Sequence, residues 1–428
     1  MSVGSRMLTT LRSLASLLLS YGLLLLANGL FNTLLGIRTR LEGFPTEVTG
    51  IIMGSYFLGL LMGGLFGARV VARAGHIRSF AAFASIMSIT ALLHVLWVEP
   101  LAWLIMRALS GFCMAGMIMV TESWLNERAG NEIRGQVLSL YMITNYFFAG
   151  LGQFLLPLAD PAKFHLFSLV SIVFSLALLP VLMTRAKAPP PTQPHPGNVR
   201  ELYRLAPLGV LGAVCAGMVN ASFHGMGPVF AQGTGLTLVE TSLFMGCAIF
   251  GGLLLQWPIG RISDRLDRRK IIMLATAITT MCCIAIAIAA QFAAPWLFVA
   301  AAIYGSFSFT VYSLCAAHTN DRAPPEQRIQ TASVMLVAYG VGAAGGPVLA
   351  GAFMGQLGEI GLFVQSALVM GFLTCYALYR TRRRDASTQT KRYVPMPASQ
   401  YTSDQLYTAA RDQMDKDLAS MMMAPRRR

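Results

Sequence analysis

The chain has 428 residues, of which 55% are hydrophobic and only 12% are charged, and its mean hydropathy is +0.58. Soluble globular proteins carry about 25% charged residues, so this composition excludes a soluble enzyme. The apolar residues form runs of about 20, the length needed to cross a bilayer core of roughly 30 Å. They do not alternate as the strands of a membrane β-barrel do. The sequence therefore predicts an all-α, multi-pass membrane protein.

Taken in chain order, the apolar runs predict twelve membrane-spanning helices separated by short charged loops. The predicted spans are residues 13–36, 47–69, 79–98, 101–121, 135–158, 164–183, 205–230, 239–260, 270–290, 295–318, 329–353 and 361–380. Because their number is even, we expect the two termini on the same side of the membrane.

Positive charge indicates which side that is. The chain carries 33 Lys and Arg and a formal net charge of +14. Arg38, Arg40 and Lys163 fall in loops opposite the termini and Arg107 falls inside a span, which leaves 29 of the 33 on the side of the termini. Since Lys and Arg are retained in cytoplasmic loops during insertion, the sequence predicts an N-in/C-in topology. The basic charge is thereby explained without a nucleic acid partner.

An internal repeat divides the chain into two halves. When the sequence is shifted by 192 positions, Gly59 aligns with Gly251. When it is shifted by 194, residues 126–129 (Asn-Glu-Arg-Ala) align with residues 320–323 (Asn-Asp-Arg-Ala). Six spans in each half give both halves the same orientation, related by an axis along the membrane normal. The repeat predicts two parallel six-helix bundles.

Composition places the boundaries of these bundles. A proline run that ends at Gly197 is typical of a stiff, unstructured linker. The predicted parts are an N-terminal bundle at 1–183, a cytoplasmic linker at 184–204, a C-terminal bundle at 205–380 and a basic cytoplasmic tail at 381–428. In the tail, a spacing of four predicts a short amphipathic helix, with disorder as the alternative. Its apolar positions are Leu406, Ala410, Met414 and Leu418.

Loop and helix motifs resemble those of the major facilitator superfamily. Residues 260–269 (Gly-Arg-Ile-Ser-Asp-Arg-Leu-Asp-Arg-Arg) are similar to its G-x-x-x-D-R-x-G-R-R loop, with Asp267 in place of the second glycine. The first-half loop has Ala72 where that motif has Asp, and Arg107 to Gly111 are similar to the R-x-x-x-G motif. The resemblance covers residues 13–380. It implies a transporter in which spans one, four, seven and ten line a central cavity.

A closer resemblance, to the YcaD-like bacterial branch of that superfamily, rests on three further stretches. They are residues 256–261 (Gln-Trp-Pro-Ile-Gly-Arg), Glu122 with Ser123, and Tyr141 with Asn145 and Tyr146. This resemblance implies a multi-pass protein of the bacterial inner membrane.

Polar residues inside the spans are candidates for substrate binding or proton coupling. Arg107 lies six residues into its span, roughly 9 Å from the outer surface, where a charge is costly. We expect it to face the cavity and pair with an anionic group, the alternative being hydrogen bonds to neighbouring helices. His224 is expected to bind substrate or carry a proton, because imidazole titrates near physiological pH. The full set is Arg107, His224, Asn28, Asn32, Asn220, Tyr304, Tyr312, Tyr141 and Asn145.

Charged residues at the cytoplasmic ends of the spans are candidate gate residues. They are Arg73, Glu122, Glu127, Asp264 and Arg265. Glu122 lies about 22 Å further in than Arg107, at the inner surface. We expect Asp264 to pair with Arg265, and Arg73 with Glu122 or Glu127, when the protein opens outward. Positive-inside topology is the alternative explanation for the arginines, but it does not explain the carboxylates.

Together these features predict a secondary active transporter that moves a small organic solute by alternating access. No Walker A sequence is present, which excludes an ATPase of its own. Arg107 favours an anionic metabolite, and proton coupling is a hypothesis that rests on Arg107, His224 and Glu122. We expect a monomer in the lipid bilayer with no cofactor and no metal site. The alternatives are efflux of lipophilic compounds and, more remotely, a non-transporting receptor or partner protein.

Overall fold

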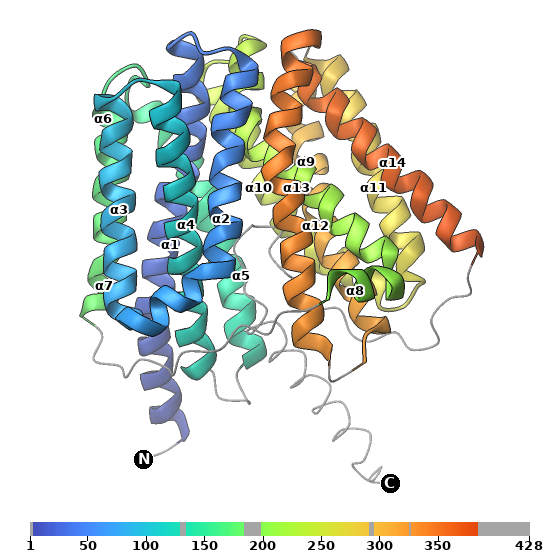
Figure 1. The fold of residues 1–428 in the computed structure, drawn as a ribbon, viewed down its shortest axis with the longest axis horizontal. Coiled ribbons are helices and arrows are strands. Elements are labelled where there is room, and N and C mark those ends of the chain that lie inside the picture. The colour runs from blue at the N-terminus through green and yellow to red at the C-terminus, as the bar shows by residue number, and fades with distance from the viewer. Residues whose placement is uncertain (1–2, 129–133, 184–197, 291–294, 325–326, 384–428) are drawn as a thin grey trace.

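The computed structural model of the chain describes residues 3–128, 134–183, 198–290, 295–324 and 327–383, and its regular elements there are all helices (Figure 1). The long helices are α1 (Val3–Leu41), α2 (Thr46–Ala74), α3 (His76–Leu96), α4 (Pro100–Arg128), α5 (Arg134–Gln153), α9 (Pro207–Gly233), α10 (Leu238–Ser263), α11 (Arg268–Ala289), α12 (Trp296–Arg322), α13 (Arg328–Leu357) and α14 (Gly361–Arg383). The shorter ones are the 3-10 helix η1 (Leu156–Leu158), α6 (His165–Leu176), α7 (Leu178–Leu182) and α8 (Val199–Leu205). The all-helical prediction is confirmed, and the helix predicted in the tail lies outside the described residues.

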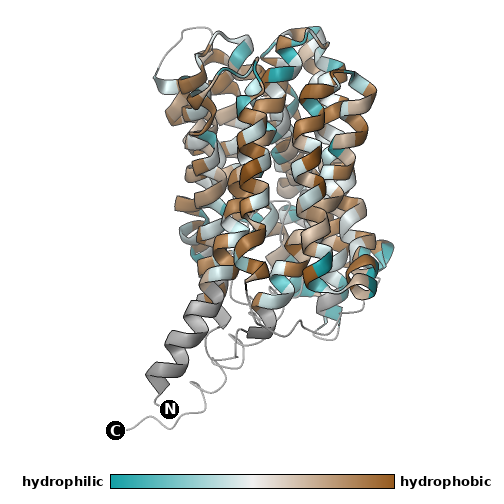
Figure 2. Ribbon diagram, turned by 90° about the vertical axis from the view of Figure 1, so that its left-hand side faces the viewer, coloured by the Kyte–Doolittle hydropathy of each residue, from teal (hydrophilic) through white to brown (hydrophobic). Residues whose placement is uncertain are grey.

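In the described part of the chain, eleven helical stretches are long and apolar enough to cross a membrane, with α6 and α7 counted as one. The long helix missing from the eleven is α5. In α5 the side chains of residues 134–136 and 138 lie outside the described part, and the stretch that remains is too short to be counted. Hydrophobic residues cover the flanks of the molecule and hydrophilic residues gather at its two ends (Figure 2). A bilayer as solvent requires this distribution.

The helices form two bundles that repeat one pattern of contacts. In the first bundle α2 packs on α4, α1 on α5 and α3 on α6. In the second bundle α10 packs on α12, α9 on α13 and α11 on α14. These pairs correspond to one another along the internal repeat of the sequence. Figure 1 shows the two bundles side by side, with α2 and α13 adjacent where they meet.

Glycines let helix backbones touch at the same crossing in both bundles. A Cβ atom on Gly59 would clash with the backbone oxygen of Ala108, and one on Gly111 with that of Tyr56. In the second bundle, the glycines 192 and 194 positions later meet backbone oxygens in the same way. Those pairs are Gly251 with Ala302 and Gly305 with Ala248. Small residues favour such crossings because close packing, rather than the hydrophobic effect, holds helices together in lipid.

The two bundles touch at one end of the molecule, which we call the outer end; the opposite end is the inner end. The outer end holds the loops at residues 42–45, 234–237 and 358–360. There Gly50 of α2 lies against the backbone of Gly351 of α13. Arg40 forms an ion pair with Glu359 across the same boundary. The interface between the bundles is therefore closed at the outer end.

The linker between the bundles is helical in its described part. Residues 184–197 lie outside that part, but α8 forms within the segment predicted to be unstructured. Asn198 explains the difference, because its side chain accepts hydrogen bonds from the backbone N–H groups of Arg200 and Glu201 and so caps the helix. The proline run that precedes Asn198 dominated the prediction from composition.

The crossing of α2 and α4 can be tested with two alanine substitutions. We expect Gly59→Ala to lower the thermal unfolding temperature in detergent, because overpacking of this kind costs about 1–3 kcal/mol. Gly64→Ala is the matched control on the same helix, since nothing lies within 4 Å of its Cβ position. Alanine there favours the helix by up to about 1 kcal/mol. Equal unfolding temperatures for the two variants would contradict the close crossing.

Candidate functional site

A cavity of about 50 Å³ lies between the two bundles, with room for about four water molecules. Side chains from α1, α5, α9, α10 and α12 line it. They are Leu25, Asn28, Gly29, Asn32, Thr33, Asn145, Tyr146, Ala149, Gln153, His224, Met245, Ile249 and Phe309. These lining residues include four carboxamides and an imidazole but no Asp, Glu, Lys or Arg. The wall of the site is therefore uncharged, with polar groups set among apolar ones, and both bundles contribute to it.

The carbonyl oxygens of two lining amides are held from behind the cavity wall. Tyr56 of α2 donates its hydroxyl to Oδ1 of Asn28 at 3.1 Å. Arg107 of α4 donates through Nη2 to Oδ1 of Asn32 at 2.7 Å. The two amides lie one turn apart on α1, so they lie on the same side of this helix. Helices α2 and α4 thus fix the polar face that α1 turns to the cavity.

Arg107 reaches the cavity through Asn32 rather than directly, unlike the expectation from sequence. Only 1% of the residue is exposed. Its guanidinium lies 4.2 Å from the ring centroid of Tyr56 and 5.7 Å from that of Phe31. Cation–π contacts of this kind contribute about 0.5–2 kcal/mol. The positive charge therefore lies one residue behind the wall.

His224 lines the cavity from the opposite bundle. It lies 192 positions after Asn32, so the internal repeat makes the two residues equivalent. Its ring stacks on that of Phe309, with centroids 5.2 Å apart and 18° between the planes. Among the described residues, neither ring nitrogen has a hydrogen-bond partner. Both nitrogens are therefore available to a ligand.

A chain of hydrogen-bonding groups leads from the cavity into the first bundle. Asn145 donates through Nδ2 to the hydroxyl of Tyr21 at 2.5 Å. The hydroxyls of Tyr21 and Tyr141 are hydrogen-bonded, and their rings stack with centroids 4.7 Å apart. Tyr141 donates to Oε1 of Glu122 at 2.5 Å. Because Glu122 is only 1% exposed, this carboxylate lies inside the bundle, whereas the sequence placed it at the inner surface.

Among the lining residues that the sequence analysis missed, Gln153 has the clearest structural role. Its Nε2 donates to the backbone oxygen of Gly29 at 3.2 Å, and its Oε1 accepts from Thr33 at 2.5 Å. These bonds hold α5 against α1. The signal in the sequence was the spacing of Tyr141, Asn145 and Gln153, which puts all three on one face of α5.

Three predicted site residues lie in the core of the second bundle and do not line the cavity. Asn220 accepts a hydrogen bond from Ser308 at 2.9 Å. Tyr312 packs on Tyr339 with ring centroids 4.8 Å apart, and Tyr304 packs among phenylalanine rings. All three predicted residues are buried. Their contacts join helices, which is the alternative role that the sequence left open.

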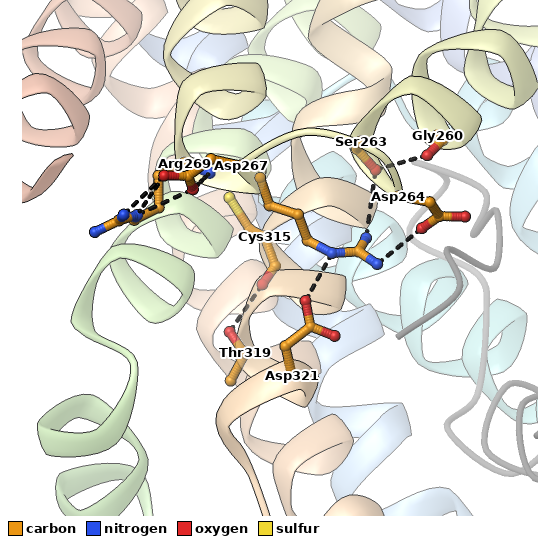
Figure 3. Close-up of polar contacts among 9 residues, drawn as sticks. Gly260, Ser263, Asp264, Asp267, Arg269, Cys315, Thr319 and Asp321 are labelled. Atoms are coloured by element: carbon orange, nitrogen blue, oxygen red, sulfur yellow. Dashed lines mark hydrogen bonds and ion pairs between the residues drawn. The ribbon is translucent and has the colours of Figure 1, made fainter. Parts of the chain in front are cut away.

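At the inner end of the second bundle, one arginine binds two carboxylates. Nη2 of Arg268 lies 2.8 Å from Oδ1 of Asp264, and its Nε lies 2.7 Å from Oδ2 of Asp321. Figure 3 shows Asp264 and Asp321 facing this guanidinium, with Ser263 beside them. In this conformation the turn after α10 brings Arg268 back to Asp264 and leaves Arg265 exposed, so the pair of Asp264 with Arg265 stays a prediction for the outward-open state.

A second pair lies beside this cluster in the same turn. Nη2 of Arg269 is 2.7 Å from Oδ2 of Asp267. Burial raises the pKa of the Asp267 carboxyl, but the hydrogen bonds and charge of Arg269 outweigh burial, so the pKa lies below its usual value. Because the pKa of Asp267 is lower in the folded state than in the unfolded state, this pair stabilises the fold at any pH above the unfolded-state pKa. The stabilisation is lost as the pH falls through the folded-state pKa.

Of the gate residues predicted in the first bundle, Arg73 and Glu122 are described with their side chains, and these two do not form an ion pair. Arg73 is exposed and has no ion-pair partner among the described residues. Glu122 is buried and accepts from Tyr141. The side chain of Glu127, near the end of α4, lies outside the described part of the chain. A clamp between the bundles at the inner end stays a prediction for a different conformation.

Comparison with known sequences places the chain among membrane transporters. The sequence profile of the Major Facilitator Superfamily matches residues 17–328. The chain is 28% identical over 365 residues to the "Uncharacterized MFS-type transporter YcaD" of Salmonella newport (strain SL254), which covers 85% of this chain and 94% of that protein. The protein of the same name from Salmonella heidelberg (strain SL476) matches with the same identity and coverage.

Solved structures of transporters share the fold. The nucleoside transporter NupG has a TM-score of 0.74 at 12% identity, covering 87% of this chain and 100% of that chain. A bacterial homolog of the human lysosomal transporter Spinster, in an inward-facing and occupied conformation, has a TM-score of 0.68 at 15% identity, covering 87% and 96%. The peptide transporter POT has a TM-score of 0.71 at 14% identity, covering 87% and 94%. At these identities the likeness concerns the fold alone.

The arginine cluster at the inner end can be tested by removing its centre. We expect Arg268→Ala to lower the free energy of unfolding by about 3–5 kcal/mol, because it breaks a buried ion pair and leaves carboxylates without their cation. Arg265→Ala is the matched control in the same loop, where an exposed side chain contributes within about 0.5 kcal/mol. Thermal unfolding in detergent measures both. An Arg268→Ala protein as stable as the control would contradict the cluster's role.

Proposed function

The chain belongs to the Major Facilitator Superfamily, a family of membrane transporters, and we propose that it carries a small anionic metabolite by alternating access. It is a transport protein and not an enzyme. The observation that carries the finer proposal is the cavity between the bundles, which has an uncharged lining that includes four carboxamides and is backed by the buried cation of Arg107.

The proposed topology has the inner end in the cytoplasm and twelve spans. The excess of Lys and Arg on the side of the termini supports the orientation. Helix α5 is counted as the twelfth span because it packs on α1 and α10, between the bundles. The similar Salmonella proteins support a place in the bacterial inner membrane. A cavity enclosed by one chain supports a monomer as the transporting unit.

Alternating access requires that the outer contacts separate while the solute stays bound in the middle. The contacts to be broken are the approach of Gly50 to Gly351 and the ion pair of Arg40 with Glu359. Exposed ion pairs contribute about 0.2–1 kcal/mol, so this pair does not lock the outer end. In this conformation the outer contacts are closed above the cavity. The opening that would release the solute from here is therefore toward the inner end.

The charge of Arg107 favours an anion over other solutes. An anion that contacts Asn32 would lie about 6 Å from the guanidinium, where a unit charge gains about 3 kcal/mol at an effective dielectric constant of about 20. No carboxylate lines the cavity to attract a cation. Efflux of lipophilic cations is the competing hypothesis. The lack of a carboxylate in the cavity wall disfavours it.

Proton coupling is proposed to run through Tyr21 and Tyr141 to Glu122, and Asn145 holds the hydroxyl of Tyr21 beside the cavity. The hydroxyls of Tyr21 and Tyr141 both accept and donate hydrogen bonds, so a proton can pass along them to the buried carboxylate. His224 is a second titratable group, and it lines the cavity itself. Protonation of Glu122 would remove a buried charge and change how α4 and α5 are held together.

The anion proposal can be tested by a thermal-shift screen of the detergent-purified protein. The probes are dicarboxylates, phosphate monoesters, uncharged sugars and lipophilic cations. A ligand that binds only the folded state at a hundred times its Kd stabilises it by about 2.7 kcal/mol. We expect an anion to raise the unfolding temperature. Stabilisation by lipophilic cations alone would reject the anion and favour efflux.

Proton coupling can be tested with Glu122→Gln in proteoliposomes once a solute is identified. We expect a pH gradient to drive no accumulation by this variant, because the amide cannot take up a proton, while solute exchange without a gradient stays within about threefold of the wild-type rate. Glu99→Gln, at an exposed outer position, is the matched control and should keep gradient-driven uptake. Unchanged gradient-driven uptake by Glu122→Gln would remove Glu122 from the mechanism.

A further inference from the structure

The orientation of one amide in the cavity wall identifies the group that touches the solute, given the proposed function. Asn32 lines the cavity, and its Oδ1 accepts from Nη2 of Arg107 at 2.7 Å. A guanidinium has only donors, so the oxygen of this amide, and not its nitrogen, must face α4. The Nδ2 group consequently lies at the other end of the amide, toward the cavity.

The amide is fixed because Arg107 is itself fixed. The guanidinium is buried and is enclosed by the rings of Tyr56 and Phe31. Turning the amide of Asn32 would put Nδ2 against a buried cation that can only donate. Among the described residues, no acceptor binds Nδ2 of Asn32. Its N–H groups therefore face the cavity and are available to donate hydrogen bonds to a solute.

The second bundle offers a group at the equivalent position. His224 follows Asn32 by 192 residues and lines the same cavity, with its ring held by stacking on Phe309. A solute between the two would thus be contacted from both bundles by side chains related through the repeat. Binding of the solute would therefore change the contacts of both bundles at once.

We infer that Asn32 selects the solute: its Nδ2 donates to an oxygen of a carboxylate or phosphate group, and Arg107 is a positioning residue that acts through this amide. A solute that brings only N–H donors to this point meets the N–H groups of Asn32 and is rejected. The cation raises the selectivity for anions without being displaced from its contacts with Tyr56 and Phe31.

The first test replaces the donor by an acceptor of the same shape. Asn32→Asp keeps an oxygen for Arg107, so the protein is expected to fold, but it turns a carboxylate oxygen to the cavity. We expect the affinity for succinate and for glycerol 3-phosphate, the two probes, to fall at least tenfold by thermal shift. Asn220→Asp is the matched control, because Asn220 also accepts through Oδ1 but lies outside the cavity. It should bind within threefold of wild type.

A second variant separates this inference from direct contact between Arg107 and the solute. Asn32→Leu removes the amide and leaves the guanidinium free to reach into the cavity. Direct contact predicts unchanged or tighter anion binding, which would overturn the inference. Contact through Asn32 predicts at least a tenfold loss. Size-exclusion chromatography of each variant shows whether it is folded.

The positioning role of Arg107 has its own readout, the ratio of affinities for an anion and its uncharged amide. Succinate and succinamide are the probes. Arg107→Lys still donates to Oδ1 of Asn32 and should keep the preference for succinate within threefold. Arg107→Met frees the amide to turn and should reduce that preference at least tenfold. Equal ratios in the two variants would overturn the positioning role.

Failure of the inference is distinguishable from failure of the proposed function. If wild type binds an anion but Asn32→Asp and Asn32→Leu bind it equally well, the anion stands and Asn32 is rejected. If neither succinate nor glycerol 3-phosphate stabilises wild type, the anion proposal fails, and the inference fails with it. Binding of one probe and not the other decides between carboxylate and phosphate.

Discussion

The close crossing of α2 and α4 is the constraint on which the rest of the site depends. Gly59 and Gly111 let the two backbones touch, and any larger side chain would separate them. Gly111 meets the backbone of Tyr56, and Gly59 that of Ala108, next to Arg107. The crossing therefore brings the guanidinium over the aromatic ring at 4.2 Å and keeps both behind α1. The cation is held inside the bilayer by one hydrogen bond to Asn32 and by the rings of Tyr56 and Phe31.

The second bundle repeats the crossing but not its chemistry. Ala248 and Ala302 occupy the positions of Tyr56 and Ala108 at the equivalent contact. Ala301, the neighbour of Ala302, stands where the repeat places Arg107. One bundle thus holds its cavity side chain with a buried cation, and the other holds its own with a ring stack. Duplication supplied the architecture, and divergence of a few side chains gave the two walls different roles.

The order of the helices, the repeat and the polar stripe of α1 could be predicted because each depends on spacing along the chain. Contacts between helices could not, because the sequence does not give the rotation of each helix about its axis. Arg107 was expected to point into the cavity and instead meets Asn32 behind it. The contact of Asp264 with Arg268 was not foreseen, because it depends on the turn after α10. The helix that Asn198 caps was not predicted, because the prolines before it indicated an unstructured linker.

Helix α5 contributes Asn145 and Gln153 to the cavity and Tyr141 to the buried hydrogen-bond chain. Each polar residue that serves the cavity makes the helix a poorer substrate for the insertion machinery, which reads apolarity one segment at a time. Its partner α1, made first, offers Gly29 and Thr33 as acceptor and donor for Gln153. We therefore expect insertion of α5 to depend on α1, which already lies in the bilayer and offers hydrogen-bond partners to Gln153.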